Sequence, residues 1–297
     1  MAGLREDITH LAAIDRLPCS PGEREAAEWI AARLRESGAR VAVEEEQVVG
    51  SYYLPLGLMA AAGALGGLAA LRGRKLLGGV LGALATAGLY QALTGSMRRA
   101  VRARLPQRAT WNVVAEAGDP DAAATLVVHA HHDAARTAFI FDQAAIRLIG
   151  DHLPSLRDRL DRWPPLMGLV AAGPALVALG GLLGARRATT VGTGMSAATT
   201  AMMAHMARQP VVPGANDNLT GVAVLLEVAR RLEGRAPAGL RVVLLSAGSE
   251  ESNQDGMLAY ARRHFSELPP ERTTFLCLDT VGSPELLLIE GEGFLKM

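Results

Sequence analysis

Metal-capable side chains follow directly after a short apolar run, Thr125 to Val128. The run has β-branched residues and no breaker, so it predicts a buried strand. Strand alternation would place His129, His131 and Asp133 on one face of the sheet. His132 would then point to the opposite face. Because ligands of open α/β sheets bind beyond the carboxyl ends of the strands, His131 could bind a metal ion there and Asp133 could orient the site.

Two further apolar runs are predicted to be strands that end in acidic residues. Leu240 to Leu245 leads into Glu250 and Glu251, and Thr273 to Leu278 leads into Asp279. Adjacent carboxylates at the end of an apolar strand cost free energy unless a cation or a water network uses them. The recurrence indicates that several strand ends contribute to one site.

A turn-rich loop carries one more carboxylate. Asp217 precedes a predicted helix from Gly221 to Leu232. An isolated aspartate at this place would serve as an N-cap. Because three predicted strands end in residues of the same chemistry, Asp217 is also a candidate metal ligand.

The segments around these motifs have the pattern of an α/β protein. Residues 4–17 show helical spacing, and Ser20 would cap a second helix that begins with Pro21. Arg40 to Val49 alternate as a strand, and a further strand is expected at 111–115.

Two pairs of long uncharged runs interrupt this pattern. The first pair is Leu54 to Leu71 and Leu76 to Leu93, and the second is Leu166 to Gly184 and a weaker run, Ala188 to Ala207. A helix of about 18 residues spans about 27 Å, close to the thickness of a bilayer's hydrocarbon core. The pattern predicts two transmembrane helical hairpins and a lipid bilayer as partner. The alternative for the first pair is a buried hairpin in a large soluble core.

The hairpins set the predicted domain organisation, because each returns the chain to the side that it left. Residues 1–53, 96–165 and 209–297 would form one soluble domain, and 54–95 and 166–208 would be the two inserted hairpins. Residues 139–163 are partly amphipathic and basic toward their end. This segment would be either an interfacial helix on the membrane surface or a helix packed on the domain.

Basic residues near the spans predict the orientation. The domain side has nine, namely Arg98, Arg99, Arg102, Arg104, Arg108, Arg157, Arg159, Arg162 and Arg208. The far connectors have five, namely Arg72, Arg74, Lys75, Arg186 and Arg187. This count favours an integral protein of the plasma membrane with a cytoplasmic soluble domain.

Charge and cysteine content exclude other classes. The formal net charge is zero, so nothing indicates a nucleic-acid partner. The two cysteines, Cys19 and Cys277, lie far apart and do not indicate a disulfide framework.

The four motifs in order resemble the co-catalytic zinc aminopeptidases. The residues that carry the resemblance are His131-x-Asp133, Gly214-Ala215-Asn216-Asp217-Asn218, Glu250-Glu251 and Leu278-Asp279-Thr280-Val281-Gly282. That family includes zinc exopeptidases related to bacterial leucyl aminopeptidase, glutamate carboxypeptidases, glutaminyl cyclases and the inactive transferrin-receptor ectodomain. The resemblance covers the soluble segments and not the hairpins, so the chain would be a membrane-embedded variant. It implies a mixed, mostly parallel central sheet flanked by helices and a zinc-dependent exopeptidase acting on peptides.

The resemblance also implies a role for each candidate residue. His131 and Asp279 would hold one Zn²⁺ ion, Glu251 would hold a second, and Asp217 would bridge the two. Of the remaining carboxylates, Glu250 would be the general base, and Asp133 would orient the first metal site.

One departure from the family pattern concerns a final histidine ligand for the second zinc. No histidine follows Asp279, so the chain would be truncated before it and would bind fewer than two zinc ions tightly. His152, His205 and His264 are substitutes in principle. Two alternatives to a peptidase therefore stay open: a catalytically inactive scaffold or receptor of the same fold, and a one-zinc acyltransferase similar to glutaminyl cyclase.

Overall fold

The computed structural model describes residues 2–94, 102–139, 143–152, 166–235, 237–289, 291–292 and 295–296. The chain forms two compact units. The first, here called the sheet unit, comprises 1–51, 103–135 and 211–287. The second, here called the bundle unit, comprises 52–102, 136–210 and 288–297.

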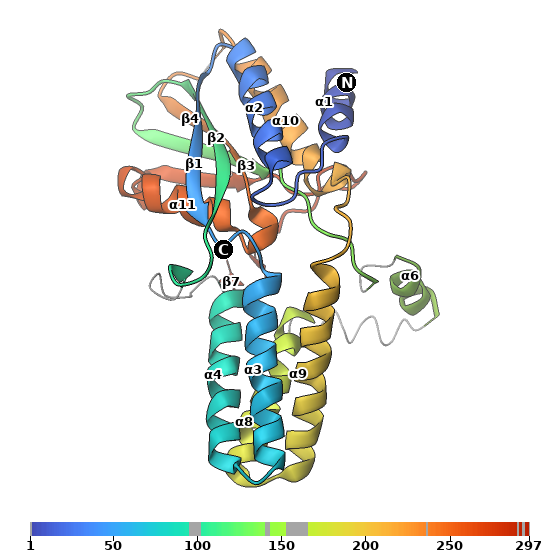
Figure 1. Cartoon of the computed structure of the whole chain (residues 1–297). Coiled ribbons are helices and arrows are strands. Elements are labelled where there is room, and N and C mark those ends of the chain that lie inside the picture. Colours follow the sequence, from blue (N-terminus) through green and yellow to red (C-terminus); the bar gives the residue numbers. More distant parts are fainter. Residues whose placement is uncertain are drawn as a thin grey trace. The chain divides into compact units, whose positions relative to one another are not determined.

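The sheet unit contains the predicted α/β elements and one helix that was not predicted, Asp255–His264 (Figure 1). In chain order they are α1 (Ala2–Ala12), α2 (Pro21–Glu36), β1 (Arg40–Val48), β2 (Arg108–Gly118), β3 (Ala124–His131), α10 (Thr220–Leu232), β4 (Leu240–Ala247), α11 (Asp255–His264) and β5 (Thr273–Cys277). The start of α2 is capped as predicted, because Glu23 N donates to Ser20 Oγ at 3.2 Å and Pro21 occupies the first turn.

The five strands form one mixed sheet in the order β1-β2-β4-β3-β5. β3 is parallel to both β4 and β5, whereas β2 is antiparallel to both of its neighbours, β1 and β4. Four described strands therefore run in one direction and β2 runs in the other. This arrangement confirms the α/β class with a mixed central sheet flanked by helices.

Helices cover both faces of the sheet. On one face, Val128 of β3 and Leu244 of β4 pack into a core with α1, α2 and α10, where Ile30 and Leu225 are fully buried. On the other face, the neighbouring strand residues pack with Tyr260 of α11. Alternation along each strand supplies both cores, because successive side chains point to opposite faces.

Parallel pairing aligns the carboxyl ends of three strands. His131 at the end of β3 pairs with Ala247 at the end of β4, and His129 pairs with Cys277 at the end of β5. The residues that follow these ends are therefore brought to one edge of the sheet.

The bundle unit contains two helical hairpins at the two pairs of uncharged runs (Figure 1). The helices are α3 (Tyr53–Leu71), α4 (Lys75–Leu93), α8 (Leu166–Leu183) and α9 (Arg186–Met206). Each of them packs mainly on two neighbours, in the order α3-α4-α8-α9 around the bundle, and α3 also contacts α8. The unit also contains α6 (Gln143–His152), β6 (Gly291–Glu292) and β7 (Leu295–Lys296).

Two of these helices are long and apolar enough to cross a membrane, judged by length and composition: α3 and α4. The apolar stretch of α8, Gly168–Leu183, is shorter, and the threonines, serine and histidine of α9 make it less apolar. Membrane crossing by four helices stays a prediction.

Parts of two other predictions fall outside the described residues. Of the expected interfacial helix 139–163, the structure describes α6, whereas 140–142 and 153–163 lie outside. Five of the nine basic residues counted for orientation also lie outside: Arg98, Arg99, Arg157, Arg159 and Arg162.

Candidate metal centre

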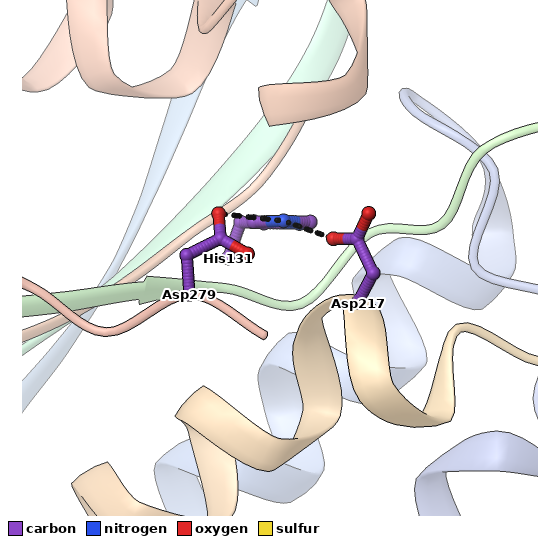
Figure 2. Close-up of side chains that lie close together, drawn as sticks. All are labelled: His131, Asp217 and Asp279. Atoms are coloured by element: carbon purple, nitrogen blue, oxygen red, sulfur yellow. Dashed lines mark hydrogen bonds and ion pairs between the residues drawn. The ribbon is translucent and has the colours of Figure 1, made fainter. Parts of the chain in front are cut away.

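Three of the predicted ligands converge at the sheet edge (Figure 2). His131, Asp217 and Asp279 each offer one ligand atom, and these atoms all lie within 4.8 Å of one another. His131 Nε2 is 3.0 Å from Asp217 Oδ1 and 3.8 Å from Asp279 Oδ2. The histidine is 4% exposed, whereas the two aspartates are about half exposed, at 57% and 45%. The group is therefore open to solvent on its carboxylate side.

Each ligand comes from a different element. His131 ends β3, Asp279 lies two residues after the end of β5, and Asp217 lies in the turn Ala215–Leu219 before α10. Asp217 makes no capping hydrogen bond to α10, and the N–H of Gly221 in its first turn instead donates to Asn218 Oδ1 at 3.1 Å. The capping alternative for Asp217 is therefore wrong, because the neighbouring residue has that role.

Asp133 holds the segment that carries the two glutamates. Its Oδ1 accepts a hydrogen bond from Glu250 N at 3.0 Å, and its Oδ2 accepts one from Glu251 N, also at 3.0 Å. Asp133 Oδ1 also lies 3.4 Å from His131 Nδ1, although this pair is not aligned as a hydrogen bond. A fully buried carboxylate thus lies beside the histidine and fixes the backbone of the glutamate segment. The orienting role of Asp133 toward the metal site stays a prediction.

Glu250 faces the same group, with its Oε2 3.8 Å from His131 Nε2. Burial raises the pKa of Glu250 to about 7, helped by the charges of Asp133 and Asp279 and opposed by that of His131. Burial likewise raises the pKa of Glu251 to about 8. Among the described residues, Glu251 does not belong to the group of three, so its assignment to a second ion stays a prediction.

The electrostatics of the site favour a bound cation. Burial lowers the pKa of His131, but the nearby carboxylate of Asp133, the hydrogen bond with Asp217 and the charge of Glu250 outweigh this and raise it well above its usual value. Asp133 remains ionised because His131 and the Glu250 N–H lower its pKa despite burial. A divalent ion could take the place of the proton on His131 Nε2. One imidazole and two carboxylates are a donor set that zinc accepts, so the residues fit the ion.

The other histidines do not join the group. His132 points away, as predicted, and its Nδ1 is 2.9 Å from Ser246 Oγ. His264 of α11 pairs with Glu44 at 2.9 Å. His152 and His205 belong to the bundle unit.

Buried charged residues bind the backbone of the loops that carry the site residues. Arg16 is fully buried, and its Nε donates to His132 O and its Nη2 to Pro213 O, both at 2.8 Å. It therefore joins the loop after β3 to the loop that carries Asp217. The sequence contains no signal for this role, because an arginine in a loop is ordinarily exposed.

Glu23 supports the glutamate segment in the same way. Its Oε1 accepts from Ser249 N at 2.6 Å, Ser249 Oγ at 2.9 Å and Thr110 Oγ1 at 2.9 Å. Its Oε2 accepts from Cys19 N at 2.8 Å. Ser249 has φ 49°, a left-handed conformation that a non-glycine residue rarely adopts. Glu23, in the first turn of the helix that Ser20 caps, thus stabilises the turn before Glu250.

Comparisons with known proteins agree with this chemistry. Residues 188–289 match the family model described as Peptidase family M28. The match covers less than half of the chain, and it includes Asp217, Glu250, Glu251 and Asp279 but not His131. This segment is therefore similar to that family. No curated protein matches the chain.

Several solved structures are also similar. A Zn-dependent exopeptidase from Parabacteroides distasonis has 14% identity and a TM-score of 0.46, over 95% of this chain and 61% of that one. A glutaminyl cyclase from Bacteroides thetaiotaomicron has 12% identity and a TM-score of 0.48, over 98% and 65%. An aminopeptidase from Aneurinibacillus has 13% identity and a TM-score of 0.45, over 95% and 71%. The chain thus spans less than two thirds of the first two of these proteins.

Proposed function

We propose that the chain is a zinc-dependent exopeptidase that removes an N-terminal residue from a peptide and is embedded in a membrane through its two hairpins. The observation that carries the enzymatic part is the convergence of His131, Asp217 and Asp279 beside Glu250. The match of residues 188–289 to a peptidase family supports the same reaction class.

The residues divide into those that hold the ion and those that handle protons. His131, Asp217 and Asp279 would hold zinc, which supplies Lewis acidity toward the substrate carbonyl when bound. Glu250 would take a proton from the attacking water and deliver it to the leaving amine. Asp133 holds Glu250 in place through the backbone, because it accepts the N–H of that residue.

The experiment for this mechanism is Glu250→Gln in the full chain. Hydrolysis of a fluorogenic aminoacyl amide should fall by about 100-fold to 10,000-fold, because general-base catalysis contributes that much. Zinc content, measured by atomic emission, should be unchanged, because Glu250 is not one of the three grouped ligands. Activity that survives the substitution would reject Glu250 as the base.

A second candidate function is favoured by the number of grouped ligands. Three protein ligands and one open position suffice for a single catalytic zinc ion. A one-zinc acyltransferase that cyclises N-terminal glutamine is therefore tested separately, with a peptide that begins with glutamine. Loss of ammonia from a glutamine peptide without cleavage would identify it. Zinc-free, inactive protein would instead indicate a scaffold.

Large apolar side chains on the surface of the bundle support the membrane part of the proposal. Leu56 and Leu89 are buried between the helices, but Leu65, Leu76, Leu84 and Leu183 are 63–78% exposed. Glycines lie between the helices, where a Cβ on Gly82 would come within 2.6 Å of Ala178 N. Helices in lipid pack through small residues and present large apolar ones to the acyl chains.

Charge placement in the bundle points the same way. Residues 52–94 and 166–208 contain no aspartate or glutamate, and five basic residues lie in the two connectors. The proposal predicts that the chain stays in the membrane fraction after extraction with alkaline carbonate. Release into the supernatant as folded protein would show that the bundle is a soluble module. The cytoplasmic orientation of the sheet unit is part of the same proposal and is tested by protease protection in intact cells.

A further inference from the structure

The third ligand of the group, Asp279, comes from a weakly packed part of the sheet. Asp279 follows β5, an edge strand of the sheet that pairs with β3. The side chains of Phe275 and Leu276 in β5 are 39% and 43% exposed. Packing of this strand therefore contributes little to fixing the position of Asp279.

A buried asparagine forms hydrogen bonds with the backbone on both sides of Asp279. Asn218 is 1% exposed, and its Nδ2 donates to Leu278 O at 2.8 Å. Its Oδ1 accepts from Thr280 N at 3.3 Å. The two groups that Asn218 binds are the peptide groups immediately before and after Asp279. A side-chain amide suits this task because it carries a donor and an acceptor side by side.

The backbone around Asp279 needs such a partner. Thr280 has φ 48°, a left-handed conformation that is costly for a β-branched residue and persists only where surrounding contacts hold it. The neighbouring contact is also close: a Cβ on Gly221 would lie 2.5 Å from Leu278 O. Glycine at the start of α10 therefore lets the Asp279 segment approach Asn218.

A second contact strengthens the same junction, because Asn216 Oδ1 accepts from Gly282 N at 3.2 Å. Asn216 and Asn218 flank Asp217 in the chain. One loop thus supplies Asp217 to the group and also forms hydrogen bonds with the segment that carries Asp279.

We propose that Asn218 is a positioning residue of the metal centre: by bracketing Asp279, it holds that carboxylate within reach of His131 and Asp217 and so sets the affinity for zinc. The inference rests on the proposed zinc function and deepens it. Asn218 itself is not a ligand, because both ends of its amide are occupied by backbone groups.

The test is a zinc titration of the full-length chain in detergent by isothermal calorimetry. Asn218→Ala should weaken zinc binding by about 10-fold to 100-fold, as loss of a residue that orients a ligand does in other metal sites. Asn218→Asp keeps the acceptor and loses the donor to Leu278 O, so its affinity should lie between those of the alanine variant and the unaltered chain.

The matched control is Asp7→Ala. Asp7 is a buried polar residue of the sheet unit that pairs with Arg33 and Arg230, away from the metal centre. Its loss should lower thermal stability and leave zinc affinity unchanged. If Asp7→Ala weakens zinc binding as much as Asn218→Ala, general destabilisation explains the effect and the inference is wrong.

A double-mutant comparison separates positioning from stability. In a chain that already carries Asp279→Ala, Asn218→Ala should cause no further loss of zinc affinity, because the ligand that it positions is gone. Additive losses would overturn the inference. Unchanged affinity in Asn218→Ala alone would overturn it and leave the proposed function standing. No zinc uptake by the unaltered chain would remove the proposed function and the inference together.

Discussion

The sheet unit and the bundle unit use the same apolar residue types in opposite ways. In the sheet unit, leucines such as Leu34, Leu225 and Leu244 are completely buried. In the bundle, Leu65 and Leu84 are more than 60% exposed. Water drives large apolar side chains inward, whereas in lipid they gain nothing from leaving the surroundings and small residues form the contacts. The proposal that the bundle lies in a membrane accounts for this difference between the two units.

The two units also differ in buried charge. Asp7, Arg16, Glu23 and Asp133 are all buried in the sheet unit, and each has several polar partners. The described buried polar residues of the bundle are Thr189 and Ser196. Chemistry that depends on charge is thus concentrated in the sheet unit, where buried networks can orient it.

The largest expected effect comes from one substitution made in both units. Leu225→Ala in α10 should destabilise the sheet unit by about 2–5 kcal/mol, because it removes a fully buried side chain. Leu84→Ala in α4 should leave unfolding in detergent nearly unchanged, because Leu84 is 63% exposed. In a chain that carries Trp163→Phe, thermal unfolding followed by tryptophan fluorescence reports the sheet unit through Trp29 and Trp111, and far-ultraviolet circular dichroism reports the helices. Equal losses would remove the contrast between the units.

Zinc should stabilise one unit and not the other. At a concentration 100 times its Kd, a ligand that binds only the folded state adds about 2.7 kcal/mol. The fluorescence transition of the sheet unit should therefore move upward on addition of zinc and return on addition of a chelator. The same titration of His131→Ala should show no shift. A zinc-dependent shift in that variant would place the binding site elsewhere.

Paired glycines in the bundle test its packing. Gly78→Ala places a Cβ that would overlap Gly66 O, and such overpacking should cost about 1–3 kcal/mol. Gly194→Ala has nothing within 4 Å of its new Cβ and should be neutral or stabilising by up to about 1 kcal/mol, the difference in helix propensity. Thermal melts in detergent compare the two. If Gly78→Ala is as stable as Gly194→Ala, the close approach of α3 and α4 is wrong.

The smallest expected effect is a pH dependence confined to the sheet unit. Burial and the charge of Asp133 raise the pKa of Glu23 to about 8, although hydrogen bonds from Ser249, Thr110 and Cys19 oppose this. The folded state then binds more protons than the unfolded state between about pH 4.5 and 8, so the free energy of unfolding falls as the pH rises through that window.

Glu23→Gln removes this titration. The stability of the variant relative to the unaltered chain should therefore increase from pH 5 to pH 8, by about 1 kcal/mol for each pH unit. Melting temperatures measured by fluorescence across this range provide the comparison. A stability difference that does not change with pH would contradict the raised pKa of Glu23.

The sequence by itself determined the parts that local pattern encodes. Apolar runs ending in His131, Glu250 and Asp279 predicted strands with their carboxyl ends at one edge, and parallel pairing of β3, β4 and β5 brings those ends together. Uncharged runs predicted the two hairpins, and the Ser20 cap predicted the start of α2. These features follow from periodicity and local hydrogen bonding, which short stretches of chain specify.

Only the tertiary structure decided the roles that depend on distant contacts. Glu23 accepts a hydrogen bond from Ser249, 226 positions away in the chain. Asn218 forms hydrogen bonds with the backbone on both sides of Asp279, about 60 positions away. It also decided that Gly78 and Gly82 face a neighbouring helix whereas Leu65 and Leu84 are exposed, because composition alone does not say which face of a uniformly apolar helix meets a neighbour. Such choices are made by packing between elements, which no single segment encodes.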